Sequence, residues 1–362
     1  MNFTRPASNS TGGKSRPERV ASERASPERP GLLPDFLKPR TNPSAPFRVA
    51  VILVPGFALM SFASVIEPVR GANRLSGRTL YHWRLYAPEN EMVGGGMVES
   101  NSGITVAAAP VADLEQENFD IVVICAASHA EHRRYRAVEE LLRRLARRNV
   151  ALAAVSTGSF VLARAGLLAD RRCTVHWDYA DSFAEAFPDI QLCNDLFVVD
   201  GSVLTCAGAT AALDMMLQLI GAHNGQELAR QISGQFLHGG IRAAADDQRR
   251  MLLGMGVTNS VVQKAVSLME AAIEEPLALT ELTRGTGVSQ RQLERLCKRY
   301  LGATPAQYYV QLRLERARRI LRQTDMSVAE VAIACGFVSL SHFAKVYRRH
   351  YGCSPREDRK AS

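Results

Sequence analysis

The spacing of hydrophobic and polar residues divides the chain into two regions of different character. Between residues 47 and 223, short apolar runs alternate with longer amphipathic stretches. The runs predict strands at 47–54, 82–87, 120–127 and 149–156, and then a hairpin over 196–207 with its turn at Asp200-Gly201. The stretches between them predict helices at 61–75, 131–148 and 209–223. Such alternation is typical of a parallel sheet covered on both faces, so an α/β domain is expected here.

The pattern after residue 258 contains helices alone, and it repeats. ELTRGTGVSQRQLERLCKRYLGATP (281–305) is matched by EVAIACGFVSLSHFAKVYRRHYGCSP (330–355), with one extra residue in the turn of the second copy. Each copy predicts a short helix, a turn with a glycine, a capping serine and a longer basic helix. A continuous helix over 305–322 is expected to join the copies. This is the layout of a double helix-turn-helix, whose second helices can enter the major groove of DNA.

The distribution of charge agrees with this division. The chain carries a net charge of +8, and residues 258–362 hold 17 basic and 10 acidic residues, whereas residues 47–257 hold 19 and 22. A basic end on a mildly acidic body suggests a polyanionic partner for that end only. A solvated arginine-rich helical face would explain the charge equally well.

The remaining segments predict flexible connections. Residues 1–46 are rich in Pro, Ser, Arg and Gly, and they are expected to form a flexible basic tail. Residues 224–257 have a mixed pattern interrupted by Gly239-Gly240, and they are taken as a connector. The expected domains are therefore a sensor domain over 47–223 and a DNA-binding domain over 258–362.

Cysteine usage and hydropathy indicate the compartment. The seven cysteines are scattered without a C-x-x-C pair, which favours buried free thiols over disulfides or a zinc site. No metal or other cofactor is predicted. No apolar run reaches the roughly 18 residues of a membrane span, and the N-terminus lacks the apolar core of a signal peptide. A cytoplasmic protein without a membrane partner is expected.

The helical region resembles the AraC-type DNA-binding domain. IACGFVSLSHFAKVYRRHYGCSP (333–355) is similar to that family's signature nearly throughout, and the first repeat is similar to its weaker first motif. The resemblance implies base-reading contacts from Arg291, Glu294 and Arg295 in the first unit, and from Ser341, His342 and Lys345 in the second. The outward faces and cap positions of the same two helices add Ser289, Lys298, Arg299, Ser339 and Arg348 as expected DNA contacts. Leu340 departs from the pattern, because polar residues often occur at its position, and this puts base reading by Leu340 in doubt.

The α/β region contains a nucleophile-elbow layout. In ALAAVSTGSF (151–160) a buried strand is followed by a tight turn and the start of a helix, with Ser156 at the apex. The region 47–223 resembles the class I glutamine amidotransferase-like superfamily, in its PfpI branch, and fits best the domain that opens the GlxA-type regulators. Three segments carry the likeness, namely 51–73, 158–177 and 207–219. The resemblance implies a flavodoxin-like fold.

In the catalytic relatives the apex of the elbow is a cysteine, and a downstream histidine activates it. Here the apex is Ser156 and the histidine position is His176, so the low-pKa nucleophile is absent. We therefore predict a non-catalytic pocket for a small anionic or carboxylated ligand. Its residues are Ser156, Thr157, Gly158, His176, Trp177 and Glu67, with Tyr179 as a further wall. The alternative is a hydrolase or amidotransferase-like enzyme that uses Ser156, His176 and Glu67 as a triad.

Together these features predict a transcription regulator rather than an enzyme. The resemblance implies an activator of catabolic genes that senses an amino acid or a quaternary amine, and that binds paired operator sites as a homodimer. RNA polymerase is a further candidate partner. A purely architectural nucleic-acid binder is a second alternative, but it would have no need for the α/β domain.

Overall fold

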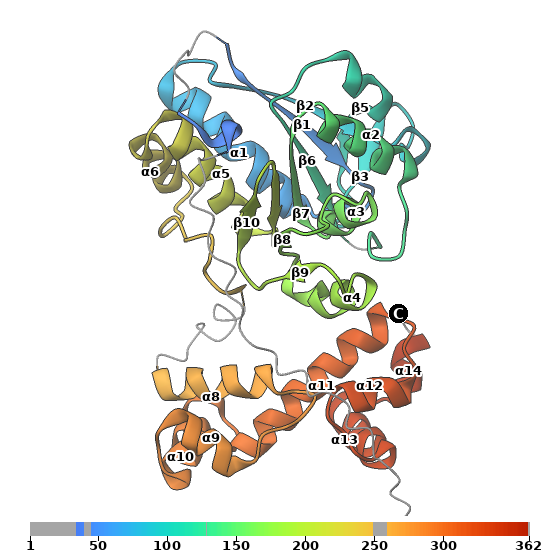
Figure 1. Cartoon of the computed structure of the whole chain (residues 1–362), viewed down its shortest axis with the longest axis vertical. Coiled ribbons are helices and arrows are strands. Elements are labelled where there is room, and N and C mark those ends of the chain that lie inside the picture. Colours follow the sequence, from blue (N-terminus) through green and yellow to red (C-terminus); the bar gives the residue numbers. More distant parts are fainter. Residues whose placement is uncertain (1–33, 40–44, 128, 249–258, 361–362) are drawn as a thin grey trace, which may run out of the picture. The chain divides into compact units, whose positions relative to one another are not determined.

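The computed structural model describes residues 34–39, 45–127, 129–248 and 259–360. Its α/β region contains a seven-stranded sheet in the order β10-β11-β7-β6-β1-β2-β5 (Figure 1). The strands are β1 (Phe47–Leu53), β2 (Tyr81–Ala87), β5 (Ala109–Pro110), β6 (Ile121–Ala126), β7 (Ala151–Ser156), β10 (Phe197–Asp200) and β11 (Val203–Cys206). All neighbours pair in parallel except β10 and β11, which form the predicted hairpin. The expected parallel-sheet α/β fold is confirmed.

Helices cover both faces of the sheet, as the apolar strands require. One face is packed by α1 (Leu59–Ser76), α5 (Thr210–Asn224) and α6 (Gln226–Gln235). The other is packed by α2 (Arg136–Arg147), α3 (Gly158–Arg164) and α4 (Ala180–Ala186). Two small ladders pair β3 (Met97–Glu99) with β4 (Thr105–Ala107), and β8 (Arg172–Cys173) with β9 (Gln191–Leu192). The sequence pattern did not predict these ladders, because their strands are only two or three residues long.

The predicted helix over 131–148 is wrong in its first turn, since α2 begins only at Arg136. The cause is a long-range contact. The guanidinium group of Arg164 donates hydrogen bonds to the carbonyl oxygens of Ala130, Glu131 and Arg133, and it fixes this segment in turns. A charged side chain that binds several carbonyls outweighs the modest helix propensity of residues 131–135.

Parts of the predicted tail and connector pack on the α/β core. Residues Asp35–Leu37 form a short helix, η1, whose Phe36 and Leu37 contact the core beside α5. Ile232 of α6, which falls within the predicted connector, is fully buried against Gly71 of α1. Residues 1–33 and 40–44 of the tail and residues 249–257 of the connector lie outside the described residues.

The C-terminal region is helical, as predicted. Its elements are α8 (Ser260–Ala271), α9 (Leu279–Thr286), α10 (Gln290–Leu301), α11 (Pro305–Gln323), α12 (Val328–Ala334), α13 (Leu340–Tyr351) and α14 (Pro355–Lys360). One small core lies among α8, α9 and α10, and a second lies among α11, α12 and α13. The continuous helix predicted over 305–322 is α11, with Pro305 in its first turn. The two repeat copies thus form two units on one joining helix.

All seven cysteines are free thiols, and five of them are buried. Burial raises the pKa of Cys173 to about 12.

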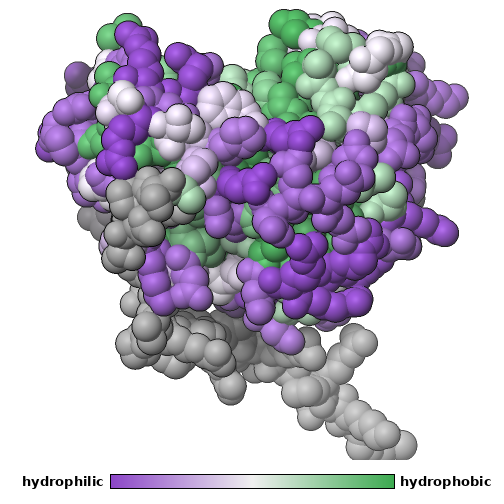
Figure 2. All heavy atoms as spheres, turned by 90° about the horizontal axis from the view of Figure 1, so that it is seen from above, coloured by the Kyte–Doolittle hydropathy of each residue, from purple (hydrophilic) through white to green (hydrophobic). Residues whose placement is uncertain are grey.

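The face of the molecule drawn in Figure 2 is largely hydrophilic, with hydrophobic residues in separate groups. Among the described residues, no helix combines the length and apolar character needed to cross a membrane.

Candidate functional site

The elbow predicted from the sequence has the expected strained backbone. Ser156 ends β7 with φ at +60°, a conformation that is rare for a residue other than glycine and costs about 1–3 kcal/mol. The neighbouring hydroxyl groups hold the turn in place. Thr157 donates to the carbonyl oxygen of Ala127 at 2.6 Å, and Ser159 donates to that of Thr174 at 2.7 Å. The Thr157 hydroxyl, which was predicted to face a ligand, therefore supports the backbone.

Close backbone packing surrounds Ser156, which is only 6% exposed. A Cβ at Gly158 would lie 2.6 Å from the carbonyl oxygen of Ile124 in β6, so only glycine fits there. A Cβ at Gly208 would lie 2.8 Å from both Ser156 Cβ and Ser61 Oγ. Ser61 is therefore the side chain of α1 that approaches the elbow, and its Oγ accepts a hydrogen bond from the Ala209 amide at 2.7 Å. The predicted site did not include Ser61.

Glu67 does not take the position that the predicted triad requires. Its carboxylate pairs with Arg70 at the surface of α1, where both side chains are more than 40% exposed. Ser61, Val65 and Pro68 are buried on the other side of the same helix. The helical period could have indicated this, because Glu67 is about 120° around the helix from the buried face that begins with Ser61.

His176 has the wrong proton arrangement for a base acting on Ser156. Its Nδ1 accepts a hydrogen bond from the Asp178 amide at 3.3 Å. Burial lowers the pKa of His176, so the ring is neutral at neutral pH, although Asp178 opposes this effect. A neutral ring that accepts at Nδ1 carries its proton on Nε2, which then acts as a donor. Within the described part of the chain, no hydrogen bond joins His176 to Ser156.

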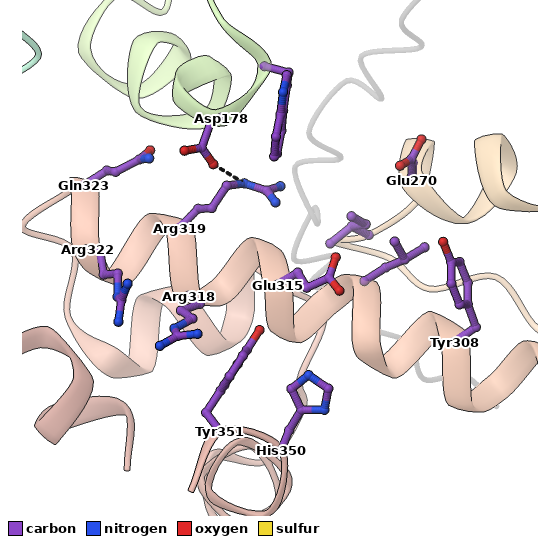
Figure 3. Close-up of a pocket in the computed structure, with 13 residues that line it drawn as sticks. Asp178, Glu270, Tyr308, Glu315, Arg318, Arg319, Arg322, Gln323, His350 and Tyr351 are labelled. Carbon is purple, nitrogen blue, oxygen red and sulfur yellow. Dashed lines mark ion pairs between the residues drawn. The ribbon is translucent and has the colours of Figure 1, made fainter. Parts of the chain in front are cut away.

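The residues after His176 contact the joining helix α11. They form the short helix η4 (Trp177–Tyr179) and then α4. Asp181 Oδ1 lies 3.2 Å from Arg316 Nε, and Asp181 Oδ2 lies 3.6 Å from a terminal nitrogen of Arg319. Arg319 also lies 4.0 Å from Asp178, the ion pair drawn in Figure 3, and its guanidinium carbon lies 5.5 Å from the centre of the Trp177 ring. We refer to residues 176–181 as the acidic segment.

A hollow of about 580 Å³ lies beside these contacts (Figure 3). The acidic segment contributes Trp177 and Asp178, and α11 contributes a row of polar side chains. The Trp177 ring, predicted to line the ligand pocket, contacts a cation of the protein itself, Arg319. Gln248, in the predicted connector, reinforces the segment. Its side chain accepts from the Trp177 amide at 2.9 Å and donates to the carbonyl oxygen of Val175 at 3.0 Å.

The first helix-turn-helix unit presents a basic helix to solvent. Gly287 ends α9 with φ at +73°, and Ser289 caps α10 by accepting from the Gln292 amide, so both turn predictions are confirmed. On α10 the predicted DNA-contacting residues Arg291, Arg295, Lys298 and Arg299 are exposed. Glu294 is half-buried and accepts a hydrogen bond from Gln290. Four cations on one exposed surface suit a phosphate-lined groove.

The second unit is held to α11 by Arg313. Its guanidinium donates to the carbonyl oxygens of Cys335 and Gly336 at 2.8 and 2.6 Å, and it lies 4.0 Å from the centre of the Phe337 ring. Ser339 caps α13 by accepting from the His342 amide. The predicted contacts Ser339, Ser341, His342, Lys345 and Arg348 are all exposed. The sequence indicated no role for Arg313, because its partners are backbone groups 22 and 23 residues away.

Arg295 and Arg299 are expected to contribute differently to DNA binding. Arg295 lies one helical turn after Arg291 on the exposed side of α10, from which it can approach base edges. Arg295→Ala should remove about 1–3 kcal/mol of discrimination at one base pair. Arg299 lies in the last turn, where a groove-bound helix meets phosphates. Arg299→Ala should weaken binding to all sequences about equally. It should also reduce the slope of log affinity against log salt concentration by about one.

The measurement is a titration of each variant against single-base variants of a selected DNA site, at several salt concentrations. Uniform loss of affinity in both variants, with an unchanged preference, would show that Arg295 contacts no base.

Comparison with known proteins gives two family matches. Residues 48–222 match the DJ-1/PfpI family, and residues 282–361 match a helix-turn-helix domain family. The first match spans the whole parallel sheet and the elbow. The second spans both helix-turn-helix units apart from α8 and the beginning of α9.

Curated relatives match over nearly the whole chain. The HTH-type transcriptional regulator GbdR of Pseudomonas aeruginosa is 41% identical over 332 residues, which cover 91% of this chain and 87% of the relative. The regulator CdhR of the same species is 40% identical and covers 85% and 90% of the two chains. The regulator GlxA of Rhizobium meliloti is 39% identical and covers 87% and 96%.

Proposed function

This chain belongs to the HTH-type transcriptional regulators that join a DJ-1/PfpI domain to an AraC-type helix-turn-helix domain, and we propose that it activates catabolic genes in response to a small metabolite. DNA-binding regulation is the common function of the family. The effector, its site, the sign of regulation and a homodimeric state form the proposal.

The observation that supports effector control is the position of the acidic segment. The segment begins at His176, which together with Ser156 forms the proposed effector site. It continues into Asp178 and Asp181, which pair with α11. Because α11 joins the two helix-turn-helix units, a displacement of the segment would act on both units at once. An effector that binds one arrangement of these contacts better than another would shift the DNA affinity by that difference.

The effector is proposed to contact Ser156 and His176 at the carboxyl edge of the sheet, where ligands of open α/β folds bind. The Ser156 hydroxyl and the Nε2–H group of neutral His176 are both hydrogen-bond donors, which suits a carboxylate. An amino acid or a betaine carries such a group. The strained backbone at Ser156 supports a binding role, because strain of this kind is concentrated at functional sites.

A ligand screen tests the proposal directly. The full chain is melted with individual standard amino acids, glycine betaine and carnitine, with and without a DNA duplex selected from a random library. A ligand at about 100 times its Kd should raise stability by about 2.7 kcal/mol. Ser156→Ala should remove this shift and leave basal DNA binding intact. Turnover of amide substrates by the wild type, lost in Ser156→Ala, would establish the enzyme alternative instead.

Asp181→Ala is expected to separate sensing from DNA binding. The variant loses the carboxylate shared by Arg316 and Arg319, so the effector should still raise the melting temperature but should no longer change the DNA affinity. Glu185→Ala is the matched control, because Glu185 is an exposed acid one turn further along the same helix. If Asp181→Ala responds to the effector as fully as Glu185→Ala does, the acidic segment does not transmit the signal.

A further inference from the structure

The two helix-turn-helix units differ by one residue in the turn, and the structure identifies which residue is extra. In the first unit Val288 alone separates Gly287 from Ser289, whereas in the second Phe337 and Val338 separate Gly336 from Ser339. Val288 packs against the core of its unit, and Phe337 is buried in the core of the other. Phe337 therefore replaces Val288, and Val338 is the inserted residue.

The insertion places apolar side chains on the exposed end of α13. Val338 is fully exposed, and Leu340, the first residue of the helix, is 49% exposed. The first unit has an exposed polar residue, Gln290, at the position of Leu340. The first unit forms the same fold with glutamine at the position of Leu340 and without a counterpart of Val338. The apolar side chains of Val338 and Leu340 are therefore not required for packing of the second unit.

We propose that Val338 and Leu340 read thymine methyl groups in the major groove, so that the second unit selects T at defined positions of its site. The inference rests on the DNA-binding function of the chain. The start of a recognition helix is the part that contacts base edges in this geometry. The C5-methyl group of thymine is the apolar group that base pairs present in the major groove, and it matches these two side chains.

The surroundings of the two residues favour DNA over a protein partner. Ser341, His342, Lys345 and Arg348 follow them on α13, all exposed, and they offer hydrogen-bonding groups and positive charge. An apolar contact at the tip of a basic, hydrogen-bonding helix fits a groove that combines phosphates with a methyl group. It fits a protein surface less well, because these cationic and polar side chains would then need partners of their own.

Deoxyuridine provides the test, because it pairs like thymidine and lacks only the methyl group. The wild-type full-length chain first selects a preferred duplex from a random library. Each T in the part of the duplex that the second unit contacts is then replaced singly by dU. At one or two positions the replacement should weaken wild-type binding about fourfold, which corresponds to the burial of one methyl group. Leu340→Gln and Val338→Ala should each remove the effect at one position. Ile333→Ala, an exposed apolar residue of α12, should not change it.

Each outcome decides between the possibilities. If the wild type selects no preferred duplex, the proposed function fails before the inference is reached. If it selects a duplex but tolerates dU everywhere, the inference is wrong. If Leu340→Gln keeps the dU effects and DNA affinity but loses transcription with purified RNA polymerase, Leu340 contacts a protein and the inference is also wrong. Val338 and Leu340 are on the surface, so their variants should fold, and thermal melting of each variant checks this.

Discussion

Asp358→Ala is expected to destabilise the second helix-turn-helix unit by about 3 kcal/mol. Asp358 is 3% exposed, and three side chains from two helices meet on its carboxylate. Tyr347 of α13 donates to it at 2.6 Å, and Arg318 and Arg322 of α11 donate at 2.9 and 2.6 Å. The short helix α14 thus holds the second recognition helix to the joining helix. Removal of the carboxylate leaves the buried Tyr347 hydroxyl without this partner.

Urea unfolding of the full chain, monitored by a probe in the helical region, measures the loss. Arg356→Ala is the control, because Arg356 is an exposed residue of the same helix, and it should change stability by less than about 0.5 kcal/mol. Asp358→Ala should also lose more affinity for the part of the DNA site that the second unit contacts than for the part that the first unit contacts. Equal stabilities of the two variants would mean that α14 does not support α13.

The contribution of Asp358 should depend on pH. Burial by itself would raise the pKa of Asp358, but the hydrogen bonds from Tyr347, Arg322 and Arg318 outweigh it, and the pKa is lowered. The folded-state pKa is therefore below the unfolded value of about 3.9. The stabilisation is present above that pH and is lost as the pH falls through the folded-state pKa. The difference in stability between wild type and Asp358→Asn should therefore shrink below about pH 4.

Gly158→Ala is expected to destabilise the α/β domain by about 3 kcal/mol, the upper end of the usual cost of overpacking, because the new methyl group would meet a backbone atom that cannot turn away. The carbonyl oxygen of Ile124 belongs to the central strand β6, so either the strand or the elbow must move. The movement should reach Ser156, and effector binding should be lost together with stability.

The same substitution at Gly234 is a control of opposite sign. Gly234 lies in the last turns of α6, and a Cβ at this position would have no atom of another part of the chain within 4 Å. Gly234→Ala should therefore leave stability unchanged or raise it by up to about 1 kcal/mol through helix propensity. Chemical unfolding of both variants gives the comparison. A Gly158→Ala chain as stable as Gly234→Ala would show that the elbow is less tightly packed than described.

The sequence alone determined the elements whose signals are local. The strands of the parallel sheet appear as apolar runs, the hairpin appears through Asp200-Gly201, and the elbow appears as a strand, a small polar turn and a helix. The double helix-turn-helix follows from a repeat that keeps the order of glycine, serine and proline, with one residue inserted in the turn of the second copy. The phase of α1 also contained the information that Ser61, and not Glu67, is on the buried face, although the prediction did not use it.

Only the tertiary structure decided which distant groups meet. The late start of α2 depends on Arg164, which is more than 30 residues away from its carbonyl partners. The pairing of the acidic segment with α11 joins residues separated by about 135 positions. The hydrogen bonds from Gln248 to Trp177 and Val175 reach back more than 70 residues. Periodicity and turn chemistry describe a few consecutive residues, whereas these contacts depend on the folded path of the whole chain. For that reason the two helix-turn-helix units could be predicted from the sequence, but the contacts between the acidic segment and α11 could not.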